Sequence, residues 1–168
     1  MNISSKNIAN LLDETLLEFK KRPVDMLNIN DGDGEYIYLK TMRASYIRTI
    51  KDIVNFFSSY NKTDTKILEI GSFLGALTFT LKKLNFDICA LDIPEFFKSK
   101  NVNDRFSENN VPYFGVNLKE YQLPFESSSF DMVVMCEVLE HLNFNPLPVL
   151  KELNRVIKKD GSIYIGMP

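Results

Sequence analysis

Residues 66–75 read Lys-Ile-Leu-Glu-Ile-Gly-Ser-Phe-Leu-Gly, and they carry the strongest structural signal in the chain. The apolar run at their start is typical of a buried parallel strand. Gly71 and Gly75 follow directly, and glycine allows a backbone to turn sharply and to lie close to a ligand. Residues 74–83 then show a helical pattern, and the free N–H groups of that helix would point into the same crevice. The stretch is therefore typical of a strand, turn and helix that hold a nucleotide cofactor.

The glycine turn departs from both of the patterns with which it can be compared. A dinucleotide-binding turn, G-x-G-x-x-G/A, requires glycine at position 73. So does the pattern acid-x-G-x-G-x-G, which Glu69, Gly71 and Gly75 otherwise match, but position 73 is Phe. Taken alone, the turn also fits an ordinary connection between a strand and a helix, so its meaning depends on residues downstream.

The composition is that of a single globular domain. The chain has 168 residues, of which 45% are apolar and 25% charged, enough for a sizeable core. Its net charge of −2 lacks the basic excess of a nucleic-acid-binding protein, and no apolar run approaches the roughly 20 residues of a membrane span. The first residues lack the charged start and apolar core of a signal peptide. Cys89 and Cys136 fall in predicted strands, so we expect reduced, buried thiols, a cytoplasmic location, and neither nucleic-acid nor membrane partners.

The hydrophobic pattern predicts an α/β chain. Two amphipathic helices come first, over residues 4–21 and 41–60, with a polar loop over residues 28–35 between them. From residue 66 strands alternate with helices, which requires right-handed crossovers and gives a mostly parallel sheet. The strands are predicted at 66–70, 87–91, 111–116, 130–135 and 162–166, and the helices at 74–83, 94–100, after Glu137 and at 146–157, with an Asn-rich loop at 101–110.

Segments downstream give the glycine turn its meaning. Asp92 ends the second predicted strand, 21 residues after Gly71, where an acid can accept hydrogen bonds from both hydroxyls of a ribose. The later motifs are Leu-Pro-Phe at 123–125, Ser-Phe-Asp-Met-Val at 129–133, Glu-Val-Leu-Glu-His at 137–141 and Arg-Val-Ile-Lys-Lys-Asp-Gly at 155–161. In order and spacing, residues 66–168 resemble the class I S-adenosylmethionine-dependent methyltransferases.

The resemblance implies a fold, a cofactor and an activity. The fold is a Rossmann-like, doubly wound, mostly parallel sheet that forms the cofactor-binding core over residues 66–168. The cofactor is S-adenosylmethionine, which leaves as S-adenosylhomocysteine after methyl transfer. Residues 1–65 carry no family motif, and we expect them to form a helical segment that is either a lid over the acceptor or a cover for the sheet.

The resemblance also implies roles by position. Glu69 would line the methionine end of the cofactor, and Asp92 would hold its ribose. Ile93 would pack on the adenine, whose amino group would meet Asn117, an amide where the family usually has a carboxylate. Phe73 replaces a glycine that gives the cofactor room, so its ring either points away or crowds the methionine tail. The complete predicted cofactor site is Glu69, Gly71, Ser72, Phe73, Gly75, Asp92, Ile93, Asn117, Leu118, Met135 and Cys136.

His141 is the only histidine in the chain. Because histidine titrates near neutral pH, one interpretation is a general base for a substrate hydroxyl. A second is a metal site with Glu137 and Glu140, since the motif resembles the metal-binding helix of ubiquinone-pathway and small-RNA methyltransferases, although a second histidine is absent here. A third is that the motif only orients a helix at the pocket mouth. We predict His141 as the candidate base and no metal.

The sequence ends at Pro168, directly after the fifth predicted strand. Related methyltransferases continue with a helix and an antiparallel pair of strands, so we expect a core that is incomplete at its C-terminus and open along the fifth strand. A fragment of a longer enzyme is the first interpretation, a homodimer across that edge the second, and a short inactive relative the third.

The expected function is methyl transfer to a small molecule. O-methylation of a sugar or polysaccharide precursor is favoured by the likeness of residues 143–150 and 164–168 to uncharacterised methyltransferases of such pathways. A cofactor-binding module without catalysis is the alternative, motivated by Phe73 and the open edge. An NAD-dependent oxidoreductase is the third hypothesis, and the spacing of Gly75 and the later motifs stand against it. The sequence does not identify the acceptor, or whether O, N or C is methylated.

Overall fold

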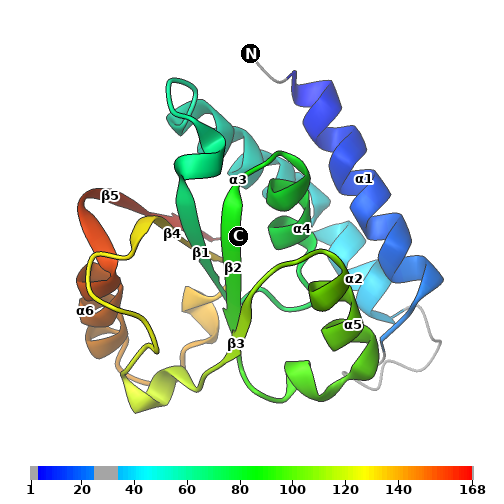
Figure 1. Ribbon diagram of the computed structural model, residues 1–168. Helices are drawn as coiled ribbons and strands as arrows, with labels where there is room; N and C mark the ends of the chain where they lie inside the picture. Colours follow the sequence, from blue (N-terminus) through cyan, green and yellow to red (C-terminus); the bar gives the residue numbers. More distant parts are fainter. Residues whose placement is uncertain (1–3, 25–33, 168) are drawn as a thin grey trace.

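Five strands form one parallel sheet, which confirms the predicted fold class (Figure 1). The computed structural model describes residues 4–24 and 34–167, and the statements below concern these residues. The spatial order of the strands is β3-β2-β1-β4-β5. Because the order reverses between β1 and β4, their carboxyl ends form the crevice where doubly wound sheets bind ligands. The strands are β1 (Lys66–Ile70), β2 (Asp87–Asp92), β3 (Tyr113–Gly115), β4 (Phe130–Cys136) and β5 (Ile157–Gly166).

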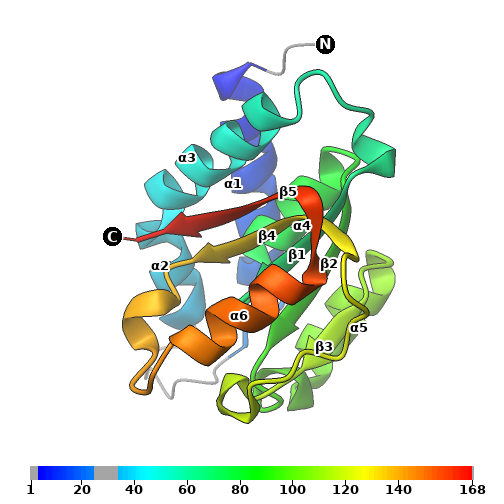
Figure 2. The same cartoon turned by 90° about the vertical axis from the view of Figure 1, so that its left-hand side faces the viewer.

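The helices lie on both faces of this sheet. Side chains alternate along the central strands, so that Ile67 of β1 belongs to one apolar layer and Leu68 and Ile70 to the other. Helices α1, α3, α4 and α5 cover the first face, and α6 covers the second (Figures 1 and 2). The α-helices are α1 (Ser5–Lys21), α2 (Gly34–Thr41), α3 (Arg43–Phe56), α4 (Ala76–Lys83), α5 (Lys100–Glu108) and α6 (Leu147–Val156). Single 3₁₀ turns are η1 (Lys62–Asp64), η2 (Phe96–Lys98), η3 (Leu118–Glu120) and η4 (Leu139–His141).

The N-terminal helices pack on the first face of the sheet. The side chain of Ser4 accepts a hydrogen bond from the backbone of Asn7, which caps the start of α1. The apolar stripe of α1 is buried, as its spacing predicts, and contacts α4. A two-pronged ion pair between Arg43 and Asp13, at 2.6 and 2.7 Å, joins α3 to α1. The first described residues therefore form a layer over α4.

One predicted loop is wrong, because residues 101–110 contain most of α5. The polar composition of this segment concealed a short buried stripe made by Val102, Arg105 and Phe106, at the i, i+3 and i+4 spacing of a helix. The guanidinium of Arg105 lies over the ring of Phe19, 4.1 Å from its centroid. Contacts with α1 therefore stabilise a helix that the sequence of this segment alone does not indicate.

Other boundaries also differ from their predictions; strand β3, for example, covers only Tyr113–Gly115 of the predicted 111–116. The helix predicted over 41–60 is the shorter α3, and α2, which lies directly before it, was not predicted. Most of the polar loop predicted over 28–35 lies outside the described residues, and its last two residues begin α2. Strand β5 begins at Ile157 instead of residue 162, and its pairing with β4 is irregular between Phe130 and Met132. The helices expected at 94–100 and after Glu137 are the single turns η2 and η4. Among the described helices, none combines the length and apolar character needed to cross a bilayer.

Candidate functional site

The glycine turn lies at the carboxyl end of β1, against β2 and the segment after β4. Gly71 has φ +76°, and its N–H donates to the carbonyl oxygen of Leu91 at 2.8 Å. A Cβ placed on Gly71 would lie 2.1 Å from Cγ2 of Val138, so a side chain has no room there. Gly75 has φ +87° and directly precedes α4. Both positions therefore require glycine, for conformation and for space.

Phe73, the departure from the glycine pattern, also has a left-handed backbone, with φ +49°. Its ring makes edge-on contacts with Tyr38 of α2 and with Phe96 of η2, at centroid distances of 5.7 and 5.1 Å. The ring is half-buried and packs on the apolar cluster between α1, α4 and α5. The ring therefore packs toward α2 and η2.

Asp92 receives hydrogen bonds from the backbone on both of its carboxylate oxygens. Oδ2 accepts from the N–H of Phe73 at 2.6 Å, and Oδ1 accepts from the N–H of Ile93 at 2.7 Å. Burial raises the pKa of Asp92 to about 6, although these two hydrogen bonds oppose the rise. A carboxylate has about four lone-pair positions, so each oxygen can accept one further hydrogen bond. Ile93 follows directly, and its side chain is 41% exposed.

Glu69 is buried behind the turn. The hydroxyl of Thr78, on α4, donates to its carboxylate. Burial raises the pKa of Glu69 to about 8, and the charge of Asp92 adds to the rise. Glu69 therefore carries its proton at neutral pH. Beside it, the Oγ of Ser72 is buried and has no hydrogen-bond partner among the described residues, an unusual state for a buried hydroxyl.

The residues predicted to contact the adenine and the sulfonium lie at different places along the edge. Asn117 is exposed at the start of η3, and its Oδ1 accepts from the N–H of Lys119 at 3.0 Å, so it caps that turn. Leu118 is half-buried against the α6 face of the core. Met135 points into the same face, whereas Cys136 lies on the opposite face at the end of β4.

The segment after β4 approaches α3. Cys136 lies 3.4 Å from the hydroxyl of Thr49, measured from Sγ to Oγ1. Glu137 has φ +56°, its N–H donates to the carbonyl oxygen of Gly166, and its Oε1 accepts from the hydroxyl of Ser45 at 2.7 Å. The N-terminal helices therefore supply polar groups to the carboxyl edge of the sheet.

The Glu-Val-Leu-Glu-His motif does not form the shared helical face that its spacing suggested. Glu140 and His141 are exposed in η4, whereas Glu137 is half-buried and directed to Ser45. Within residues 4–24 and 34–167, no group of three or more His, Cys, Asp or Glu side chains is arranged to hold a metal ion. The three residues weighed as a metal site are therefore not assembled as one.

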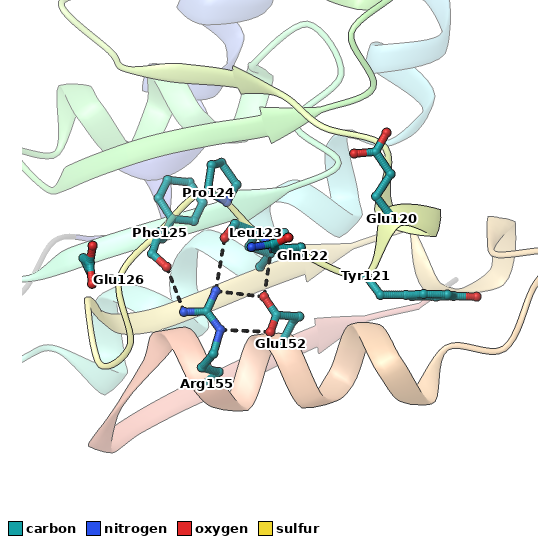
Figure 3. Close-up of a pocket in the computed structure, with 9 residues that line it drawn as sticks. All are labelled: Glu120, Tyr121, Gln122, Leu123, Pro124, Phe125, Glu126, Glu152 and Arg155. Carbon is teal, nitrogen blue, oxygen red and sulfur yellow. Dashed lines mark hydrogen bonds and ion pairs between the residues drawn. The ribbon is translucent and has the colours of Figure 1, made fainter.

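A separate cavity of about 510 Å³ lies between residues 120–126 and α6 (Figure 3). Arg155 and Glu152 line it and pair with each other at 2.8 Å. The guanidinium also donates to the carbonyl oxygens of Leu123 and Phe125, and more distantly to Ser127. Every N–H of Arg155 is thereby used within the protein, so this pair fastens the 123–127 loop to α6 and offers nothing to an anion.

The carboxyl edge fits an S-adenosyl group. It holds an acid with spare acceptor positions at the end of β2, an exposed apolar side chain next to it, and a glycine turn that has no room for a Cβ. The unpartnered hydroxyl of Ser72 adds a polar group that a bound molecule could satisfy. These three features suit, respectively, a ribose diol, an adenine ring and an amino-acid tail.

Comparison with known proteins agrees with this geometry. A model of the methyltransferase domain family matches residues 68–165, more than half of the chain. An uncharacterised protein of Methanocaldococcus jannaschii is 33% identical over 105 residues, which are 62% of this chain and 41% of that protein. The ribosomal RNA small subunit methyltransferase A of Wigglesworthia glossinidia brevipalpis is 35% identical over 79 residues, which are 44% of this chain and 30% of that enzyme. The chain thus spans less than half the length of these curated relatives.

A solved structure gives the same fold. A protein of Methanococcus maripaludis, assigned to the S-adenosyl-L-methionine-dependent methyltransferases, superposes with a TM-score of 0.61 at 20% identity, over 99% of this chain and 66% of that one. The fold and its edge define a Rossmann-like methyltransferase domain. The chain belongs to the methyltransferase domain family, which confirms the family resemblance of its motifs.

Some residues of this edge were missed by the sequence reasoning. Thr78 holds Glu69, and Ser45 holds Glu137, yet neither belongs to a recognised motif. Thr78 has a detectable signal, since it lies on the first turn of the helix that follows the glycines. Ser45 has none, because its role depends on the packing of α3 against β4.

Proposed function

We propose that this protein is an S-adenosylmethionine-dependent methyltransferase that acts on a hydroxyl group of a small molecule, such as a sugar or a polysaccharide precursor. The observation that carries the proposal is Asp92, a buried acid at the end of β2 whose two oxygens are fixed by backbone N–H groups and still have acceptor capacity. The net charge of −2 supports a small-molecule acceptor over the nucleic acid that the name of one relative implies.

In this proposal the residues of the edge bind and orient the cofactor, and they do little covalent chemistry themselves. Asp92 would accept hydrogen bonds from the ribose hydroxyls, and Ile93 would cover the adenine. Asn117 would accept from the adenine amino group through the second lone pair of Oδ1, whose first is used for capping. Gly71 and the buried Ser72 would lie along the methionine tail. The cofactor supplies an activated methyl group, so the protein contributes orientation and, for a hydroxyl acceptor, a proton acceptor. His141 remains the base predicted from the sequence.

Two further features belong to the same proposal. Strand β5 is the outer strand of the described sheet, and Ile163 and Ile165 are exposed along it, which supports a homodimer across this edge as one interpretation. The two cysteines are free and buried, which supports a cytoplasmic location. A cofactor-binding module without catalysis remains the alternative, since Phe73 replaces a glycine of the turn.

Calorimetric titration with S-adenosylhomocysteine tests the cofactor site. We expect micromolar binding by the natural chain and a loss of about 100-fold in Asp92→Ala, because two hydrogen bonds to a charged group are removed. Asp87→Ala is the matched control, since Asp87 is an exposed acid at the other end of the same strand. Equal affinity of all three proteins, or no binding by any, would contradict the proposal, and binding of NADH instead would favour the oxidoreductase hypothesis.

Methyl transfer tests catalysis separately. The chain would be incubated with methyl-labelled S-adenosylmethionine and a panel of monosaccharides, sugar glycosides and phenols. Label on a hydroxyl compound supports the enzyme, and no label on any compound, with cofactor binding intact, supports the non-catalytic module.

A further inference from the structure

Glu137 is a polar residue that directly follows β4 and lies close to the glycine turn. Val138 packs directly over Gly71, so the residue before it, Glu137, adjoins the turn assigned to the methionine end of the cofactor. The backbone of Glu137 is left-handed, a conformation that costs energy in a non-glycine residue and that clusters at functional sites. Its placement is therefore maintained by the surrounding structure despite local strain.

Two hydrogen bonds hold Glu137, one at its backbone and one at its side chain. The N–H of Glu137 is bound by Gly166 at the end of β5, and Oε1 is bound by the hydroxyl of Ser45 on α3. Oε2 has no hydrogen-bond partner among the described residues. A carboxylate held on one oxygen and free on the other has the geometry of an oriented proton acceptor. His141, by contrast, is exposed, and no hydrogen bond orients its side chain within the described part of the chain.

The groups around Glu137 are acidic or aromatic. Tyr38 is partly exposed beside Phe73, and burial raises its pKa, with Glu137 and Glu140 adding to the rise. Burial also raises the pKa of Tyr46, with further contributions from acids that include Glu69 and Glu137. Glu137 and Glu140 both raise the pKa of Tyr38, as acids do, so these two acids make the field at Tyr38 negative. Such a field opposes an anionic acceptor. Glu137 acts electrostatically on Tyr38 of α2, Tyr46 of α3 and Cys136 of β4, and Glu69 and Glu140 act on some of the same groups.

We propose that Glu137, positioned by Ser45, accepts the proton of the methyl acceptor, and that this acceptor is an uncharged hydroxyl compound flanked by Tyr38. The inference rests on the proposed function. The acceptor oxygen forms the new bond to the methyl carbon, and the methyl–sulfur bond breaks with its electron pair remaining on sulfur. The hydroxyl proton passes to Oε2 of Glu137, so the positive charge of the sulfonium and the negative charge of the carboxylate disappear together.

The test compares Glu137→Gln with Glu140→Gln, which removes the same charge from an exposed position three residues away. For a hydroxyl acceptor found in the labelled-transfer panel, Glu137→Gln should lower kcat by about 100-fold or more, the usual contribution of a general base. Glu140→Gln should change kcat by less than about threefold. A full loss in His141→Gln with normal activity in Glu137→Gln would overturn the proposal.

Two readouts do not depend on turnover. Affinity for S-adenosylhomocysteine should be unchanged in Glu137→Gln, and its loss there would place Glu137 in the cofactor site instead. Ultraviolet titration of the phenols, with Tyr38→Phe used to isolate Tyr38, should show a lower pKa for Tyr38 in Glu137→Gln. An unchanged Tyr38 titration would also overturn the proposal. Absence of S-adenosylhomocysteine binding by the natural chain is a different result, because it contradicts the proposed function itself.

Ser45 is a positioning residue and has its own signature. Ser45→Ala should lower kcat and shift its acidic limb, since the hydroxyl that stabilises the ionised carboxylate is removed, and Ser45→Thr should restore both. If Ser45→Ala lowered only stability and left the pH profile in place, the assignment of Ser45 would be wrong.

Discussion

The carboxyl edge of the sheet is rich in polar groups, and so is the Arg155 clamp, by which we mean Arg155, Glu152 and the 123–127 loop that they hold. The two regions differ in how many of their polar groups have hydrogen-bond partners. Around Arg155 each donor has an acceptor within the protein, and the pair with Glu152 lowers the pKa of that acid through a hydrogen bond. At the edge, Glu69 and Asp92 have raised pKa values, and Ser72 has an unpartnered hydroxyl. The clamp lines a cavity of about 510 Å³, yet the edge has the chemistry to bind a ligand.

This difference separates polar groups that hold the fold together from polar groups kept for a ligand. A cluster in which every polar group has a hydrogen-bond partner gains its full stabilisation when the chain folds. A cluster with unpaired polar groups lowers the stability of the fold, because buried charges and unpaired hydroxyls are unfavourable. That loss is recovered only when a ligand binds. The comparison predicts opposite effects for substitutions in the two regions.

The largest effect is expected at Glu69. Its folded-state pKa of about 8 lies above the ordinary value of 4.5, so the folded chain keeps a proton that the unfolded chain releases between these pH values. The contribution of Glu69 to the free energy of unfolding is therefore fully present below pH 4.5 and is lost as the pH rises through 8. Glu69→Gln cannot ionise and should be more stable than the natural chain at pH 9 by on the order of 4 kcal/mol.

Urea unfolding at pH 5 and pH 9 measures this difference. The two proteins should differ little at pH 5, where Asp92 contributes equally to both. If Glu69→Gln were less stable than the natural chain at pH 9, Glu69 would belong with the polar groups that are fully hydrogen-bonded in the fold.

An intermediate effect of opposite sign is expected at Arg155. Arg155→Leu should lower the free energy of unfolding by about 2 kcal/mol, because two loop carbonyls and a carboxylate lose their donor. Affinity for S-adenosylhomocysteine should stay the same. Arg43→Leu is the control, since its ion pair with Asp13 is largely exposed and should contribute about 1 kcal/mol or less. A selective loss of cofactor affinity in Arg155→Leu would erase the distinction between the two regions.

The smallest effect is expected at Phe73. Phe73→Gly removes a strained left-handed residue but also loses the edge-on contacts with Tyr38 and Phe96. Because each change is worth about 1 kcal/mol, the free energy of unfolding should shift by less than about 1 kcal/mol. The more informative measurement is the affinity for S-adenosylhomocysteine, which should be within about threefold of the natural chain. A large gain would show that the ring crowds the cofactor after all.

The sequence predicted best what depends on short-range pattern. Strands β1, β2 and β4 begin at their predicted residues and end at or one residue beyond them, because buried parallel strands are continuous apolar runs. The positions of Gly71 and Asp92 follow from the strand ends, and the structure brings them to one edge, with Phe73 bonded to Asp92.

What the sequence did not predict depends on contacts between distant segments. Helix α5 forms on a stripe of three buried side chains in a polar segment. The start of β5 depends on pairing with β4, and the position of Ser45 depends on how α3 lies against that strand. The direction of the Phe73 ring depends on α2 and η2, which no local pattern brings together. Local propensity carries no information on such contacts.

The pKa of Asp92, near 6, has a consequence for the heat and the pH dependence of binding. A ribose diol donates to the ionised carboxylate and so lowers this pKa, which means that binding near pH 6 releases a proton into the buffer. The measured enthalpy would then differ between phosphate and Tris by the heat of buffer protonation. Occupancy of the site would fall as the surroundings acidify, so the same carboxylate that recognises the ribose would also report the acidity of its surroundings.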